Sequence, residues 1–381
     1  EEEEKQIRYP AYDMDGNKHC GDELRARRNK AIMKGMTYMH KFLRKNKFVA
    51  LYKIGDDAPS IFFEIWYTAA NSTIRARARD IAVQLTNKLQ RYIFANAKPL
   101  DDLIQQRDEF FAFMFILRSE LEMGLDGAEE MMQAAKASWV RNDFAETSRL
   151  FGVSRAELDH VRTGPWLELL MRILIMDYIN ILLTKNAFPT MYNLKDAFEV
   201  LREHRYTGVN KASSSHFQDS FYLATHIVYA LSAYSGIKTR EKDVPWLYCY
   251  IRRSFVYWMK QGKRKLKDDT VYVDVDGVGE LMDILRGVGL SEATDKMMCH
   301  GTVWLLENQL NDGSFPVWFA GYEDDDKHDF YDRIHSTWVC TQALRDRDFK
   351  VNEDCVRLWQ VYIAKIIKSS GLGKLAYKPD W

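Results

Sequence analysis

The sequence is poor in the residues that build cross-linked or turn-rich folds. Its 381 residues include only 5 cysteines, 8 prolines and 20 glycines. The cysteines are odd in number and never form a C-x-x-C pair, which indicates neither a disulfide framework nor a zinc ribbon. Because proline and glycine punctuate turns, their scarcity favours long helices over many short strands.

A net charge and a long apolar run are also lacking. The 54 basic residues balance the 54 acidic ones, so bulk electrostatics does not favour a nucleic-acid partner, which needs a basic excess or a basic stripe. The strongest basic run, residues 260–267, is followed at once by two aspartates and is interpreted as a solvated helix end. The longest apolar stretch, residues 166–183, is interrupted by three charged residues, short of the roughly 18 apolar residues of a membrane span. We therefore expect no transmembrane segment.

The common catalytic motifs are missing as well. The chain has no P-loop, no G-x-G-x-x-G, no H-E-x-x-H, no G-x-S-x-G and no kinase signature. These motifs carry nucleotide binding, dinucleotide binding, zinc proteolysis and serine hydrolysis. The usual support for those activities is absent.

What the sequence has in abundance is apolar and aromatic helix. The apolar share is 46%, with 20 Phe, 20 Tyr and 10 Trp, which allows a large core. Apolar residues recur at helical spacing almost everywhere. The expected helices cover residues 23–46, 59–70, 73–94, 101–123, 127–139, 164–184, 193–203, 216–235, 243–263, 277–288, 292–309, 331–345 and 351–369. Only residues 270–277 alternate like a strand.

The chain reads as one domain. No Pro/Ser-rich linker divides it, so we expect a single all-α domain over residues 21–381 behind a frayed or extended segment, 1–20. The last hundred residues repeat an aromatic helix after an acidic or glycine-bearing turn, which favours a ring of helix hairpins, an α/α toroid. A first residue other than methionine and one N-glycosylation sequon at residues 71–73 are compatible with a secretory route, and the localisation stays open.

About 40 residues carry a family resemblance. "WLLENQLNDGSFP" (residues 304–316) and "YDRIHSTWVCTQAL" (residues 331–344) resemble the turn and inner-helix pattern of terpenoid cyclases, protein prenyltransferases and lanthionine-type peptide cyclases. The resemblance implies the toroid fold. In the prenyltransferases and peptide cyclases it also implies zinc at one end of the ring, with His300 and His335 where ligands would lie. Those families use Asp/Cys/His or Cys/Cys/His ligands, so their chemistry does not carry over to a histidine-rich set.

Three histidines are the leading functional candidates. His226, His300 and His335 each open an aromatic-rich stretch that reads as a buried helix. A histidine on a buried face needs a partner for its second ring nitrogen, and a metal ion is the simplest shared partner. The sequence therefore predicts a three-histidine metal site within residues 216–345. The part of the chain before about residue 160 is expected to contribute walls and core.

Three further residues are candidates for acid–base work. Glu280 lies early in its helix and is a candidate fourth ligand or general base. Asp219 shares a helix face with His226, and Tyr331 is a tyrosine near the expected metal. The two aspartates before Glu280, Asp274 and Asp276, are interpreted as helix caps.

These residues predict a metal-dependent enzyme acting on a small or peptide-like substrate. Neutral imidazoles suit zinc, iron or copper. Zinc with a lyase or hydrolase activity is the first expectation, and an iron or copper oxidase is the second.

Three other functions remain open. Asp325, Asp326 and Asp329 form D-D-x-x-D, which resembles the magnesium–diphosphate clamp of class I terpene synthases and would indicate a prenyl-diphosphate enzyme. That motif lies in an acid-rich run that reads as a solvated loop. A helical scaffold with inert, packed histidines and a ring glycosidase with paired carboxylates are the other two.

Overall fold

The computed structural model of the chain describes residues 19–45, 57–96, 107–158, 163–211, 215–264, 273–316, 318–319, 330–349 and 353–375. The D-D-x-x-D motif, the last three residues of the basic run (265–267) and most of the expected N-terminal segment lie outside these residues. The described part contains fifteen α-helices and only two strands, of two residues each. The prediction of an all-α fold is therefore confirmed.

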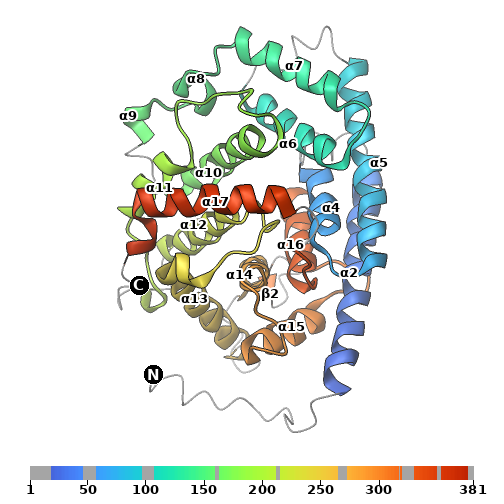
Figure 1. Cartoon of the computed structure of the whole chain (residues 1–381). Coiled ribbons are helices and arrows are strands. Elements are labelled where there is room, and N and C mark those ends of the chain that lie inside the picture. Colours follow the sequence, from blue (N-terminus) through green and yellow to red (C-terminus); the bar gives the residue numbers. More distant parts are fainter. Residues whose placement is uncertain are drawn as a thin grey trace.

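Figure 1 shows the described elements, which are labelled in chain order. The α-helices are α2 (His19–Lys45), α4 (Asp57–Thr68), α5 (Ser72–Asn96), α6 (Arg107–Met123), α7 (Ala128–Arg141), α8 (Thr147–Phe151), α9 (Arg155–Leu158), α10 (Thr163–Tyr178), α11 (Leu194–Arg202), α12 (Ser215–Leu231), α13 (Pro245–Arg264), α14 (Val275–Gly287), α15 (Lys296–Asn308), α16 (Phe330–Leu344) and α17 (Glu353–Ser370). A π-helical turn, Ile179–Leu183, extends α10.

Helix α14 lies in the interior of the molecule. Figure 1 shows it end-on, with α12, α13, α15 and α16 around it, and all four contact it. Every residue of α14 is buried. Its closest neighbour is α16, because a Cβ at Gly279 would lie only 2.9 Å from the side chain of Val339 and 3.2 Å from the backbone of Cys340. Glycine at this position lets the two helix backbones approach each other.

The segment before α14 explains how this helix begins. Strand β1 (Val273–Asp274) pairs antiparallel with β2 (Trp318–Phe319), so the predicted extended segment is present but short. Asp274 then accepts a hydrogen bond from Gly277 N at 3.0 Å and serves as the N-cap. Asp276, expected to share that role, lies in the first turn instead, and its carboxylate points to α16.

Two further sequence features have structural counterparts. No described helix combines the length and the apolar character that a membrane crossing requires. The asparagine of the sequon, Asn71, caps α5, because its Oδ1 accepts hydrogen bonds from the backbone of Thr73 and Ile74.

Candidate metal centre

A cavity of about 450 Å³ lies beside α14 and is the natural place to look for a site. Six helices line it: α4, α6, α10, α12, α14 and α16. Its polar lining side chains are Glu64, Glu168, Arg172, His226, Tyr229, Tyr234, Glu280, Asp283, Tyr331, His335 and Gln342. Apolar and aromatic side chains from α6, α10 and α16 complete the wall.

The structure brings four of the predicted site residues together and leaves two apart. His226, Glu280, Tyr331 and His335 all line the cavity. His300 lies on α15 and Asp219 lies in the first half of α12, and neither is among the lining residues. Asp219 shares a face with His226, but seven residues of helix separate them by about 10 Å along the axis. Two side chains on one face of a helix can therefore still lie far apart along its axis.

Asp276, Glu280 and His335 form a compact group of donor atoms. One oxygen from each carboxylate and one ring nitrogen of the histidine all lie within 4.8 Å of one another. The two carboxylates are one helical turn apart on α14, so they share a face, and α16 presents the histidine opposite them. Asp276 Oδ1 lies 2.8 Å from His335 Nδ1, yet accepts no hydrogen bond from any described residue.

The carboxylates of this group are buried without a permanent positive charge. None of Asp274, Asp276 and Glu280 forms an ion pair with an arginine or lysine of the described chain. Burial, followed by the charge of Asp276, raises the pKa of Glu280 to about 8. Burial and Asp276 likewise raise the pKa of Asp274 to about 6. Either a proton or a cation must compensate such a group.

His226 stands next to this group in a defined protonation state. Its Nδ1 lies 2.8 Å from the carbonyl oxygen of Tyr222. Because a carbonyl can only accept, Nδ1 carries the proton and Nε2 keeps its lone pair. Burial lowers the pKa of the ring to about 4, and the nearby His335 adds to this. The second nitrogen of His226 is therefore a neutral base at ordinary pH.

Aromatic rings fix the orientation of the other histidine. Tyr331 stacks on His335 with ring centroids 4.8 Å apart, and Trp338 meets the same ring edge-on at 5.3 Å. All three are on one side of α16, at spacings of three and four residues. The imidazole is thus held toward the carboxylates of α14.

Two carboxylates of the cavity wall were not predicted from the sequence. Glu64 on α4 accepts a hydrogen bond from Gln342 at 3.0 Å, and burial raises its pKa to about 7. Asp283 on α14 also lines the cavity, one turn beyond Glu280. Burial alone would raise the pKa of Asp283, but Arg347 and Arg345 outweigh it and hold this pKa below its ordinary value. The part of the chain before residue 160, expected to supply only walls and core, therefore also contributes an ionisable group, Glu64 on α4.

Glu280→Gln is expected to stabilise the protein at alkaline pH in the presence of EDTA. A carboxyl whose pKa is raised from 4.5 to about 8 binds more protons in the folded state. The folded protein therefore loses stability as pH rises through that window. At pH 8 the variant should be more stable by about 1–3 kcal/mol, measured by urea unfolding. Glu199→Gln, at an exposed ion pair, should leave the pH profile unchanged. A less stable Glu280→Gln protein at pH 8 would contradict this account.

Comparison of the chain with protein-family models, with curated proteins and with solved structures found no match.

Proposed function

We propose that the protein is a metal-dependent enzyme with Asp276, Glu280 and His335 as ligands. The observation that carries the proposal is the grouping of three donor atoms within 4.8 Å of one another, on the buried helix α14 and on its neighbour α16. Buried carboxylates that have no arginine or lysine partner among the described residues favour a cation at the same point. The proposal keeps His335 of the three-histidine set and replaces His226 and His300 as ligands with two carboxylates from α14.

The donor set fits a divalent transition metal. Ligands about 2.0–2.2 Å from zinc are about 3.4 Å apart in a tetrahedral site, so side-chain rotation of the group would suffice to close it. Carboxylate and imidazole ligands suit zinc first and iron second, and they suit copper less well than three imidazoles would. Zinc held there would supply a Lewis acid that polarises a carbonyl group or a water molecule.

The chain's own residues supply the remaining functions. His226 Nε2, neutral and facing the cavity, is placed to accept a proton from the attacking group. Thr225 holds Glu280 by a 2.5 Å hydrogen bond, and Tyr222 holds Asp276 at 3.0 Å. Tyr331 is a candidate proton donor at the wall. The aromatic cavity is large enough for a small or peptide-like substrate.

The arrangement of the helices supports a toroid as part of this proposal. The helices that line the cavity, α4, α6, α10, α12, α14 and α16, alternate along the chain with helices that do not line it. An α/α toroid alternates inner and outer helices in the same way. We propose that the chain has this fold or a closely related helical ring.

Metal analysis of the untagged protein tests the ligand set. The native protein should hold about one equivalent of a transition metal, as a mononuclear site requires. His335→Ala should lose it while remaining folded by circular dichroism. His300→Ala is the matched control and should keep the metal, whereas His226→Ala should keep the metal but lose catalytic activity.

Two results, one from metal analysis and one from a turnover assay, would favour a scaffold or a prenyl-diphosphate enzyme instead. Absence of metal from the native protein, even after reconstitution with zinc or iron(II), would reject the proposal and favour a helical scaffold. Magnesium-dependent turnover of a prenyl diphosphate that survives His335→Ala would favour the enzyme class indicated by Asp325, Asp326 and Asp329.

A glycoside hydrolase is a second candidate, supported by one observation. Glu280 and Asp283 line the same cavity, and their pKa values are shifted in opposite directions. A protonated and an ionised carboxyl in one cavity form the pair that glycoside hydrolysis needs. Hydrolysis of glycosides that persists after complete metal removal would favour this function over the metal-dependent one.

A further inference from the structure

A second hollow of about 560 Å³ lies at the C-terminal end of α14, and its charged lining side chains are mostly basic. It lies between α2, the start of α5, the segment after α14 and the segment after α16. Five of its lining side chains are basic and one is acidic: Arg25, Lys238, Arg286, Arg345, Arg347 and Asp346. We call it the basic groove. None of these residues lines the cavity that holds the candidate metal ligands.

The charge imbalance is largest at Arg345 and Arg347. Their side chains are only 1% and 2% exposed, and both pair with the same carboxylate, Asp283. One negative charge therefore faces two buried guanidinium groups.

Both arginines also keep unused donors. Arg345 donates hydrogen bonds from Nε to Thr68 and from Nη1 to Asp283 and to the carbonyl oxygen of Gln342. Its Nη2 and the Nε of Arg347 are buried and have no hydrogen-bond acceptor among the described residues. Buried charged donors without an acceptor are costly, so these two arginines leave positive charge uncompensated beside the groove.

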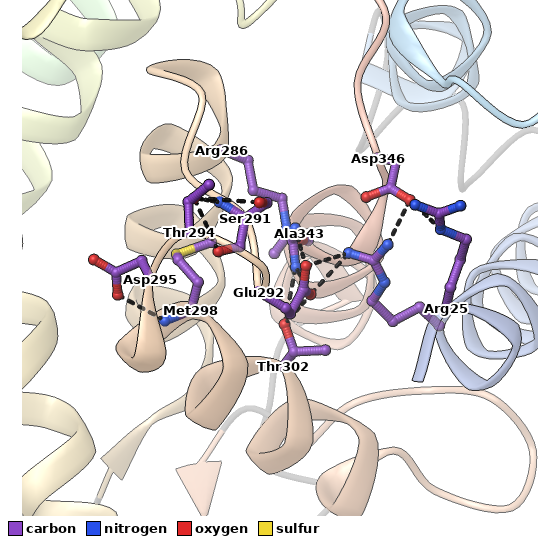
Figure 2. A network of polar contacts seen from close by, with 11 residues as sticks. Arg25, Arg286, Ser291, Glu292, Thr294, Asp295, Met298, Thr302, Ala343 and Asp346 are labelled. Atoms are coloured by element: carbon purple, nitrogen blue, oxygen red, sulfur yellow. Dashed lines mark hydrogen bonds and ion pairs between the residues drawn. The ribbon is translucent and has the colours of Figure 1, made fainter. Parts of the chain in front are cut away.

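The neighbouring charges do not cancel this excess. Figure 2 shows Glu292 between Arg286 and Thr302, with Asp346 and Arg25 farther along the network. Glu292 accepts hydrogen bonds from Arg28 at 2.7 and 2.8 Å and from Arg286 at 2.5 and 3.1 Å. Glu292 and Asp346 therefore compensate Arg25, Arg28 and Arg286. The described structure pairs neither acid with Arg345 or Arg347.

Two further charges of the groove, Arg25 and Lys238, belong to exposed side chains. Lys238 is exposed, and the side chain of Arg25 is 64% exposed with a 3.5 Å contact to Asp346. Both are long side chains that can swing over a bound anion at little structural cost. Arg25 belongs to α2, and Lys238 belongs to the segment before α13.

We propose that the basic groove is a binding site for a small molecule bearing a phosphate group. The groove is lined by two buried arginines, Arg345 and Arg347, and by two exposed cations, Arg25 and Lys238, and such a set suits a dianion with oxygens in several directions. A carboxylate is planar and would be satisfied by a single arginine fork, so it would use this arrangement less fully. The groove is larger than inorganic phosphate, which leaves room for the rest of the ligand.

Titration calorimetry with inorganic phosphate tests the site. The protein is first stripped of metal with EDTA and dialysed, and ionic strength is held constant with sodium chloride. Native protein should bind phosphate saturably below roughly 10 mM and more tightly than succinate. The Arg25→Ala/Lys238→Ala double variant should weaken phosphate binding by about tenfold or more. Both positions are exposed, so the variant should fold.

Two control variants make the result decisive. Lys242→Ala removes an equally exposed charge outside the groove and should bind phosphate like the native protein. His335→Ala should also bind it normally, which separates this site from the candidate metal centre. The proposal is overturned by equal phosphate affinity in the double variant and in native protein, by loss of binding in His335→Ala, or by no saturable binding. Tighter binding of succinate than of phosphate would also overturn it.

Discussion

Replacing Asp283 by alanine is expected to lower the free energy of unfolding by about 3–5 kcal/mol. Asp283 is the only acidic side chain that the described structure pairs with Arg345 or Arg347. Its other oxygen accepts a hydrogen bond from Ser235 at 3.1 Å. Removal of the carboxylate would leave two buried guanidinium groups facing each other, and their repulsion adds to the lost contacts.

Urea unfolding at neutral pH measures this effect, and two comparisons interpret it. Asp283→Asn keeps the shape and one acceptor, so a loss nearly as large as that of the alanine variant would assign the effect to charge. Glu199→Ala removes an exposed partner of Lys195 and should cost no more than about 0.5 kcal/mol. A cost for Asp283→Ala as small as that control would show that solvent compensates the arginines.

Replacing Glu292 by glutamine is expected to be the second most damaging change, at about 3 kcal/mol near neutral pH. Burial alone would raise the pKa of this carboxyl, but the hydrogen bonds and charges of Arg286 and Arg28 outweigh it and lower the pKa from 4.5 to about 2. The carboxylate joins α2 to α14 and accepts a hydrogen bond from Thr302 at 2.6 Å.

The pH dependence gives this prediction its signature. A lowered folded-state pKa stabilises the protein above pH 4.5, and the contribution disappears as pH falls toward 2. Native protein should therefore lose stability over that range more steeply than Glu292→Gln, by urea unfolding at a series of pH values. Glu199→Gln should follow the native profile. Parallel native and Glu292→Gln profiles would show that the arginines hold Glu292 no better than water does.

The all-α fold class could be predicted from the sequence because helical periodicity is a local property. The expected helix at residues 277–288 is α14 (Val275–Gly287), and the error at its start reflects the choice between two aspartates as the cap. Its complete burial was harder to foresee. Asp274, Asp276, Glu280, Asp283 and Arg286 give α14 the composition of a surface helix, and only tertiary packing places it in the interior.

The site was predicted in part, for a related reason. His226, Glu280, Tyr331 and His335 share the cavity because each lies on a helix that lines it. His300 opens an equally aromatic helix, but α15 does not line the cavity, and nothing in its own sequence distinguishes the two kinds of helix. Glu64 meets Gln342 from 278 residues away, a separation at which a single sequence carries no pairing signal.

That separation also affects the protein while it is being made. Helix α4 contributes Glu64 to the cavity wall, but the hydrogen-bond partners of α4 on α16 and at Arg345 lie 277 to 281 residues later. At a synthesis rate of about 5–20 residues per second, α4 waits roughly 15–55 s on the ribosome for them. Over that time the face of α4 that later packs on α16 lacks its partner. The cavity can therefore form only once α16, which supplies His335 and Gln342 to its wall, has emerged.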